Sequence, residues 1–388
     1  MTKLFNISNK IYAVSTLATT IIGVGLFSLP YITAKVGLFV MIFYFLVLGI
    51  LVILIHHFFG ELALKTPDLK RLPGFASYYL GKRGEKTAFF SSIIGTSGAI
   101  LAYLIVGGEF LTELLSPYFG GGNLIWTFVY FFLGASLIFW GIRAIAKIEF
   151  WSLIVFFIIL FLIFLHGKDF INIENLFLGM GNWKSGIKDL FLPYGPIIFS
   201  LWGASLIPEI EEMLVPAPKF GVGGKEEEKK ALRWIIPISI LIPIFLYLFF
   251  IFLILGITGQ NVTESALMGL RNVLGNGIVN LGLLFGLIAT FTSFITLGLT
   301  LKNIFCYDLK IDKNLAWFIS CFPPLILFLI GIRKFIPVIS FIGGVTIGID
   351  GILILLMYSK LKKNIIIFPL LLMLLGGIIY EIFYLLIC

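Results

Sequence analysis

The chain has 388 residues, of which 60% are hydrophobic and 12% are charged, and its formal net charge is +8. This balance lies far outside that of a soluble globular domain and predicts a protein embedded in the lipid bilayer. No polar stretch is long enough for a separate soluble domain, which argues against an enzyme. The three cysteines fit no metal-binding or disulfide pattern, and we interpret them as apolar packing residues.

Apolar stretches follow one another along the whole chain. Dividing them at clusters of charged residues, glycine and proline predicts an all-α polytopic membrane protein with about eleven transmembrane helices of roughly 20 residues each. The expected helices cover residues 10–34, 37–60, 85–116, 124–143, 146–166, 187–214, 231–258, 277–305, 314–332, 335–358 and 364–387.

The Lys and Arg residues set the expected orientation. If the N-terminus lies in the cytoplasm, the inner segments carry 21 of the 28 Lys and Arg residues and the outer segments carry the remaining 7. This bias predicts a multi-pass protein of the plasma membrane with a cytoplasmic N-terminus and an extracellular C-terminus. It also explains the positive net charge without a nucleic-acid partner, and nothing in the sequence indicates an obligate protein partner.

The first and sixth expected helices are interrupted near their midpoints. In the first, Gly25 precedes Pro30 by five positions, and in the sixth, Gly203 precedes Pro208 by the same spacing. Glycine and proline leave backbone N–H and C=O groups unpaired, and such a break persists in a membrane only where it lines a cavity inside the protein. Two breaks at corresponding places in two halves of a chain point to the binding site of a secondary transporter.

The positions of the breaks also predict an internal repeat. Five helices separate equivalent points, and an odd number reverses the second unit relative to the first. We therefore expect two inverted five-helix repeats, residues 1–166 and 187–358, followed by one additional C-terminal helix at residues 364–388.

The helix order and the two motifs resemble a known family. Residues 23–31, GVGLFSLPY, and residues 207–213, IPEIEEM, are similar to motifs of the amino acid–polyamine–organocation superfamily, which shares the fold of the bacterial leucine transporter. Within it, the chain resembles the amino acid/auxin permeases and their prokaryotic relatives. The resemblance covers the first ten expected helices. It implies a secondary active transporter that imports an amino acid by alternating access, without an organic cofactor.

The two breaks offer complementary groups to a zwitterionic amino acid. Free N–H groups at Gly23, Val24 and Gly25, with the positive end of the following half-helix behind them, suit a carboxylate. Free carbonyl groups in the sixth helix suit an ammonium group, and they belong to Phe199, Ser200 and Leu201. The alternative is that the glycines only kink two packed helices.

The resemblance assigns roles to three further aromatic positions. It implies that Tyr103, on the third helix, donates its hydroxyl to the substrate carboxylate. It also implies that Trp202 and Phe199, beside Gly203, form a lid over the substrate. The alternative for each of these side chains is ordinary packing.

The eighth helix carries a pattern that completes a sodium site in sodium-coupled members of this fold. The pattern is Ala289-x-x-Thr292-Ser293, and a hard cation wants roughly five or six oxygen ligands. The Ala289 carbonyl and the two hydroxyls supply three, and the carbonyls of Thr19 and Ile22 supply two more. The alternative is that the hydroxyls bond to their own helix.

Proton coupling is the main rival to sodium, because ionisable groups inside a membrane are costly and often functional. The candidates are Glu109, Asp350 and Glu381, and we discount Glu381 because it lies in the appended helix, away from the predicted site. His56 falls at the end of the second expected helix, and we interpret it as interfacial. The stretch of the fifth helix from Glu149 to His166 has no lysine, which argues against the version of proton coupling that uses a lysine there.

The sequence leaves the substrate and the direction of transport open. No charged residue lies at either break, which favours a neutral amino acid, and glycines on the third helix favour an aromatic or branched one. Three carboxylates follow the second break, Glu209, Glu211 and Glu212, and we expect them to pair with basic residues of the N-terminus or of the first inner loop, Lys65, Lys70 or Arg71, and close an inner gate. The alternative is a solvated helix end. The alternatives are a proton-coupled symporter, an exchanger or exporter, and a receptor of the same fold that binds an amino acid without moving it.

Overall fold

The computed structural model describes residues 2–66, 70–141, 145–177, 190–214 and 225–387, and within these ranges the regular structure is entirely helical. The α-helices are α1 (Thr2–Ile21), α2 (Leu29–Val36), α3 (Leu38–Lys65), α4 (Leu72–Phe119), α5 (Asn123–Trp140), α6 (Ile145–Gly167), α7 (Tyr194–Leu201), α8 (Ile207–Leu214), α9 (Lys225–Thr258), α10 (Arg271–Leu274), α11 (Asn276–Asn303), α12 (Lys313–Leu329), α13 (Phe335–Phe341), α14 (Ile347–Leu361) and α15 (Ile367–Ile387).

Short 3₁₀ and π turns connect or interrupt these helices. The 3₁₀ turns are η1 (Val24–Ser28), η2 (Lys168–Phe170), η3 (Ile173–Phe177), η5 (Ala204–Leu206), η7 (Gly259–Asn261) and η8 (Leu267–Leu270). The π turns are η9 (Ile304–Asp308) and η10 (Ile342–Thr346).

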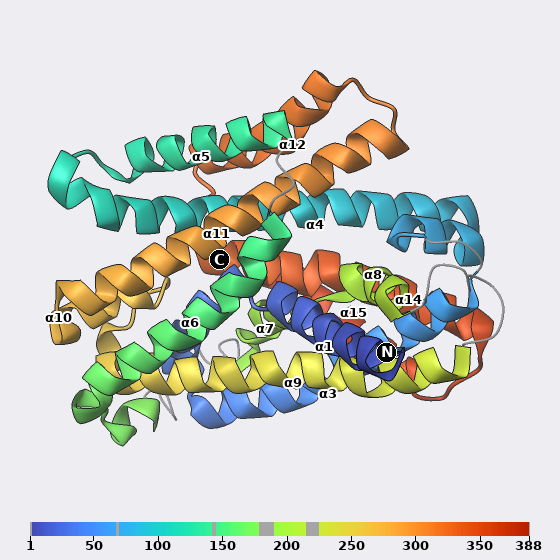
Figure 1. Ribbon diagram of the computed structural model, residues 1–388, viewed down its shortest axis with the longest axis horizontal. Coiled ribbons are helices and arrows are strands. Elements are labelled where there is room, and N and C mark those ends of the chain that lie inside the picture. The colour runs from blue at the N-terminus through green and yellow to red at the C-terminus, as the bar shows by residue number, and fades with distance from the viewer. Residues whose placement is uncertain (1, 67–69, 142–144, 178–189, 215–224, 388) are drawn as a thin grey trace.

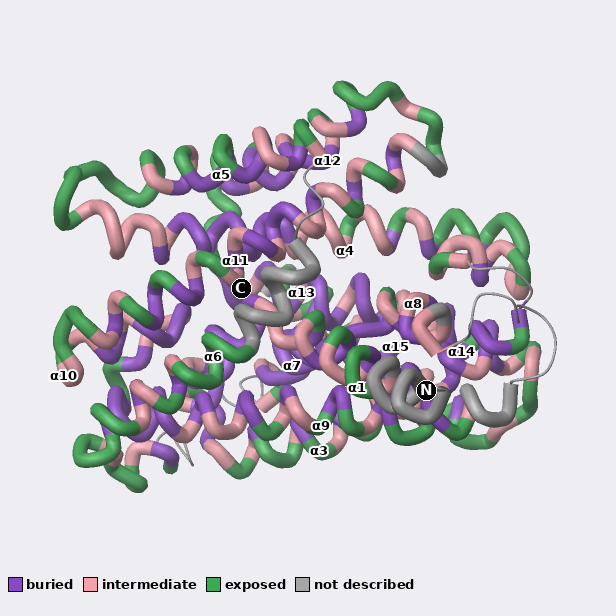
Figure 2. Tube along the Cα trace, in the orientation of Figure 1, coloured by how far each residue is buried: buried purple, intermediate pink, exposed green. Residues whose placement is uncertain are grey.

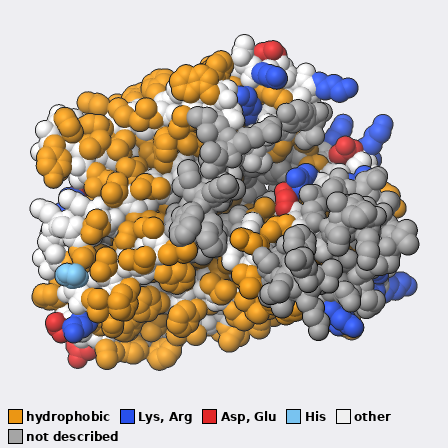
Figure 3. All heavy atoms as spheres, viewed as in Figure 1, with side chains coloured by type: hydrophobic (Ala, Val, Ile, Leu, Met, Phe, Trp, Pro, Cys, Tyr) orange, Lys and Arg blue, Asp and Glu red, His pale blue; other side chains and the backbone are white. Residues whose placement is uncertain are grey.

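The helices have the length and composition of membrane spans. In the described part of the chain, seven are long and apolar enough to cross a membrane, or eight if the bent pair Lys10–Ile21 and Val24–Val36 counts as one span. Hydrophobic side chains cover most of the left and lower parts of the face in Figure 3, and charged side chains gather towards its two ends. The chain is therefore an all-helical, multi-pass membrane protein, as the sequence predicts.

The expected break in the first span is confirmed. Helix α1 ends at Ile21, Gly23 is extended (φ −122°, ψ −160°), and the chain continues through η1 into α2 with a bend of 48°. Pro30 lies in the first turn of α2, where the missing N–H of proline costs no hydrogen bond.

The expected break in the sixth span is also confirmed. Helix α7 ends at Leu201, Trp202 is extended (φ −81°, ψ 122°), and η5 leads from Gly203 into α8. This span begins at Tyr194 rather than at the expected residue 187, and residues 187–189 lie outside the described part of the chain.

The helices pack into an elongated bundle whose broken elements lie inside. In Figure 1, α3 and α9 run side by side along one edge, α4 crosses the middle and α5 lies beyond it. Helices α1 and α7 lie between these layers, and most of α7 is buried (Figure 2). The Phe27 ring of η1 packs edge-on against Phe110 of α4 and Phe250 of α9, with centroid distances of 5.0 and 6.1 Å.

Three spans differ from the expected helices, two in where they begin or end and one in its internal regularity. Helix α3 continues to Lys65 instead of ending at residue 60, so that residues near its expected end lie inside the protein. Helix α4 begins at Leu72, before the expected span, and turns at Gly81, whose φ of 71° favours glycine. The tenth span contains the π turn η10 around Gly343 and Gly344.

Candidate functional site

The two breaks lie against each other. A Cβ atom at Gly25 would overlap the Ser200 hydroxyl and lie 3.1 Å from Phe199 Cδ1. A Cβ atom at Gly203 would lie 2.9 Å from side-chain atoms of both Leu17 and Ile21. Glycine is therefore needed at both breaks for the approach of the two spans.

A tyrosine on α9 connects the two breaks. The Tyr247 hydroxyl donates to the Ile21 carbonyl at 2.8 Å and to the Ser200 carbonyl at 2.9 Å, and the side chain is fully buried. One hydroxyl proton is thus shared between the ends of α1 and α7. Sequence reasoning missed this residue, and the available signal was a single tyrosine inside a long apolar helix, where a buried hydroxyl needs a partner.

A histidine on α3 binds the backbone of the sixth break. The Gly203 N–H donates to His56 Nε2 at 3.0 Å, and His56 Nδ1 lies 2.8 Å from the Val52 carbonyl. Nδ1 therefore carries the proton and Nε2 is the acceptor, which describes a neutral imidazole. His56 is fully buried, and its ring meets the Trp202 ring edge-on at 5.1 Å. The expectation that His56 is interfacial is wrong, because α3 extends beyond its predicted end.

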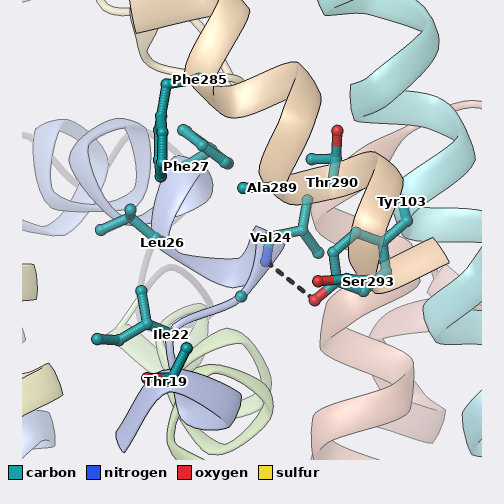
Figure 4. Close-up of a pocket in the computed structure, with 11 residues that line it drawn as sticks. Thr19, Ile22, Val24, Leu26, Phe27, Tyr103, Phe285, Ala289, Thr290 and Ser293 are labelled. Atoms are coloured by element: carbon teal, nitrogen blue, oxygen red, sulfur yellow. Dashed lines mark hydrogen bonds between the residues drawn. The ribbon is translucent and has the colours of Figure 1, made fainter. Parts of the chain in front are cut away.

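A cavity of about 40 Å³ lies between the first break, the third span and the eighth span (Figure 4). This volume has room for about three water molecules. Its wall is formed by Thr19, Ile22, Gly23, Val24, Leu26, Phe27, Tyr103, Phe285, Ala289, Thr290 and Ser293.

One end of the cavity is polar. The Val24 N–H donates to the Tyr103 hydroxyl at 3.3 Å, and a Cβ atom at Gly23 would lie only 2.5 Å from that hydroxyl oxygen. Figure 4 shows the Ser293 hydroxyl beside Tyr103. This end presents a backbone donor of the broken helix together with two hydroxyl groups.

The other end of the cavity is apolar. Leu26 and Phe27 of η1 and Phe285 of α11 lie together on the side away from Tyr103 (Figure 4). Sequence reasoning missed all three, because one phenylalanine among 41 gives no local signal. Thr290, which also lines the cavity, was missed as well.

The structure brings four of the five sodium-site candidates to this cavity. Thr19, Ile22, Ala289 and Ser293 line it, whereas Thr292 is buried outside it. The Thr292 hydroxyl donates to the Ala289 carbonyl at 3.1 Å, so these two candidate ligands are bonded to each other.

The candidate substrate residues divide into two groups. Gly23, Val24 and Tyr103 line the cavity. The others lie behind its wall, where the two breaks pack, and they are Gly25, Phe199, Ser200, Leu201, Trp202 and Gly203. The structure thus places the cavity at the first break and not at the sixth.

Ion pairs connect the spans at both ends of the bundle. Arg71 Nη1 lies 2.7 Å from Glu209 Oε1, so the expected pairing of Glu209 with a basic residue of the first loop is confirmed. At the opposite end of α4, Arg271 Nη1 lies 2.6 Å from Glu113 Oε2.

The sequence matches the model of the tryptophan/tyrosine permease family over residues 7–383. The chain belongs to this family. It is therefore a permease of aromatic amino acids and not an enzyme, and its resemblance to the amino acid–polyamine–organocation superfamily is confirmed. A comparison with curated protein sequences gives no match.

Solved structures share the fold. The closed form of Mhp1, a nucleobase-cation-symport-1 family transporter with bromovinylhydantoin bound, has a TM-score of 0.67 at 14% identity, over 96% of this chain and 90% of that one. The inward-facing form of Mhp1 has a TM-score of 0.69 at 13% identity, over 97% and 89%. A manganese transporter of Eremococcus coleocola has a TM-score of 0.58 at 12% identity, over 95% and 83%.

Proposed function

We propose that this permease imports tryptophan or tyrosine by alternating access, and that the cavity beside the first break holds the substrate. The observation that supports this most directly is the division of the cavity into a polar end, with the Val24 N–H and the Tyr103 hydroxyl, and an aromatic end, with Phe27 and Phe285. A zwitterionic aromatic amino acid has the same division. The carboxylate binds at Val24 and Tyr103, and the ring packs against the phenylalanines.

Substrate entry requires the walls of the cavity to separate. The cavity has room for about three water molecules, which is far less than an indole or a phenol ring needs. The proposed movement is the rocking of one part of the bundle against the other, built on two inverted five-helix repeats, residues 1–166 and 187–358, with residues 364–388 as an additional helix.

Sodium is the proposed coupling ion. The Ala289 carbonyl, the Ser293 hydroxyl and the carbonyls of Thr19 and Ile22 belong to residues that meet at the cavity, and neutral oxygens suit a monovalent ion that must also leave. The Thr292 hydroxyl joins them by turning away from the Ala289 carbonyl. A proton-coupled symporter or exchanger is the alternative.

The proposed orientation has a cytoplasmic N-terminus and an extracellular C-terminus in the cell membrane. In this orientation the Arg71–Glu209 pair lies at the inner end of the bundle and acts as the inner gate. The Arg271–Glu113 pair lies at the outer end.

Uptake of radiolabelled tryptophan and tyrosine into proteoliposomes, with and without an inward sodium gradient, tests the proposal. Sodium-stimulated accumulation supports it. If accumulation requires a proton gradient and does not respond to sodium, the proposed substrate is supported and the proposed sodium site is contradicted. Saturable binding without accumulation under either gradient favours a receptor and contradicts uptake.

A further inference from the structure

A carboxyl group on the last helix is buried beside the backbone of α7, with no basic partner among the described residues. Glu381 of α15 is 1% exposed, and within the described part of the chain neither of its carboxylate oxygens has a hydrogen-bond partner. We expected Glu381 to lie away from the predicted site, but it packs against Gly195 at the beginning of α7, the first half of the broken sixth span. An ionised carboxylate in such a place is unfavourable, because it has lost its hydration without gaining an ion pair.

Three glycines bring the backbone of two other elements to this carboxyl group. A Cβ atom at Gly195 would lie 2.6 Å from Glu381 Oε1, and one at Gly344 would overlap Glu381 Cγ. A Cβ atom at Gly343 would overlap the Gly195 carbonyl oxygen. Helix α7, the π turn η10 and α15 therefore meet around Glu381, and π turns inside α-helices are frequent at functional sites. We call this contact the Glu381 junction.

The first turn of α7 faces the carboxyl group. Gly195 is the second residue of this helix, and the N–H groups of a first turn have no acceptor within the helix. The positive end of the helix dipole lies there too. The surroundings therefore favour the ionised carboxyl when water also reaches it, and the neutral carboxyl when the junction is packed and dry.

The titratable groups of the packed elements do not neutralise Glu381. Helix α7 contributes Tyr194, whose hydroxyl donates to the Met373 carbonyl at 3.3 Å. Helix α13 and the π turn contain no titratable residue, and the groups on α14 and on α15 itself are Asp350, Tyr358, Lys360, Tyr380 and Tyr384. Among the described residues no basic side chain forms an ion pair with Glu381, so a proton remains as the neutralising ligand.

We propose that Glu381 is a proton-binding site whose occupancy controls the packing of α7 against the π turn. The carboxyl group carries a proton when the Glu381 junction is packed, and it releases the proton to water when α7 moves away. Because the proton favours the packed form, a fall in pH shifts the population towards it, by up to about tenfold per pH unit. Proton binding is independent of the substrate, whereas its connection to uptake rests on the proposed function.

Infrared difference spectroscopy of the purified full chain in nanodiscs, recorded between acidic and alkaline pH without substrate, tests proton binding. We expect a band of a buried carboxylic acid that disappears as the pH rises and that is absent from Glu381→Gln. Asp350→Asn is the matched control, because Asp350 is a second carboxyl with a buried oxygen that lacks a partner among the described residues. Asp350→Asn keeps the Glu381 band, and a band that persists unchanged in Glu381→Gln overturns the proposal.

The same variants test the connection to transport. Glutamine imitates the protonated carboxyl, so Glu381→Gln is expected to remove the pH dependence of tryptophan uptake that the unmodified protein and Asp350→Asn show. An unaltered pH dependence in Glu381→Gln overturns the connection. If the unmodified protein transports neither tryptophan nor tyrosine, the proposed function fails while the infrared result stands. If Glu381→Gln does not fold, Glu381→Asp replaces it, and a band that titrates at an unchanged pH contradicts the proposal.

Discussion

The two broken helices have the same sequence signature, but the structure partners their backbone groups in different ways. At the first break, the Val24 N–H donates to the Tyr103 hydroxyl on the wall of a cavity. At the sixth break, the Gly203 N–H donates to buried His56, and the Ser200 carbonyl accepts from buried Tyr247. Side chains of neighbouring helices bond both breaks, including the Ile21 carbonyl of the first through Tyr247, but of the two it is the first break that also lines the cavity.

A glycine–proline pattern in a membrane helix raises two questions: whether the freed backbone groups have partners, and whether a ligand or the protein supplies those partners. Every backbone N–H and C=O group at a break in a membrane needs a partner. The pattern shows that the partners must exist, but it does not show whether a ligand or the protein provides them. A break whose bonded groups lie away from the cavity, like the sixth, contributes to the shape and movement of the site, whereas bonded groups on the cavity wall can exchange their protein partner for a ligand.

Gly25→Leu is expected to have the largest effect, because it removes the contact between the breaks on which the comparison depends. The new side chain would overlap Ser200 and press on Phe199, so we expect complete loss of tryptophan uptake in proteoliposomes. Gly277→Leu is the matched control, since a Cβ atom there meets nothing within 4 Å. Normal uptake by Gly25→Leu would place the site elsewhere.

His56→Leu tests whether the sixth break depends on a side-chain acceptor. The change leaves the Gly203 N–H buried without its partner, which costs about 1–3 kcal/mol, and unfolding in detergent measures the loss of stability. His166→Leu is the control, because His166 Nδ1 also lies near the carbonyl four residues earlier, at 3.0 Å from Leu162 O, but on an exposed surface. Equal losses in both variants would contradict the role of His56 at the break.

Tyr103→Phe tests whether the first break presents its groups to a ligand. We expect tryptophan to bind about tenfold more weakly, which corresponds to about 1.4 kcal/mol. Scintillation proximity binding measures the affinity, and Tyr118→Phe on the exposed end of the same helix is the control. Unchanged affinity in Tyr103→Phe would remove this residue from the substrate site.

Thr292→Ala is expected to have the smallest effect. Its hydroxyl is bonded to the Ala289 carbonyl outside the cavity, whereas the Ser293 side chain lines the cavity. We therefore expect the sodium dependence of uptake to weaken more in Ser293→Ala than in Thr292→Ala, and to be lost in the double variant. A sodium response that survives the double substitution would exclude the proposed ion site.

The sequence predicts those features that local chemistry determines. Glycine and proline in an apolar helix have few structural solutions in a membrane, which is why both breaks, at Gly25 and Gly203, occur where they were expected. The Glu209 pairing was predictable because a carboxylate that follows a span meets the basic residues of a neighbouring loop. The Tyr103 hydroxyl accepts from the Val24 N–H at the first break, and its implied bond to a substrate carboxylate stays a prediction.

Contacts between distant helices were not predictable in the same way. His56 looked interfacial because the expected second span stopped at residue 60, but hydropathy does not define how far a helix continues past its apolar core. Phe285 and Tyr247 belong to apolar runs in which every position has the same local character. The neighbourhood of Glu381 depends on where an additional helix packs, and the sequence of that helix does not encode its partner.

The π turn of the tenth span accommodates one residue more than a regular α-helix would. A π turn holds one residue more than the α-helical turn it replaces, so η10 has the form of a single inserted residue. Each residue of an α-helix advances the direction of the side chains by about 100°. The wider π turn takes up this rotation locally, so deleting one residue between positions 342 and 346 would restore regular pairing and leave α14 facing nearly the same way relative to α13. Tyr358 would still reach Glu61, to which its hydroxyl donates at 2.7 Å, whereas an extra residue in the regular part of the helix would turn it away.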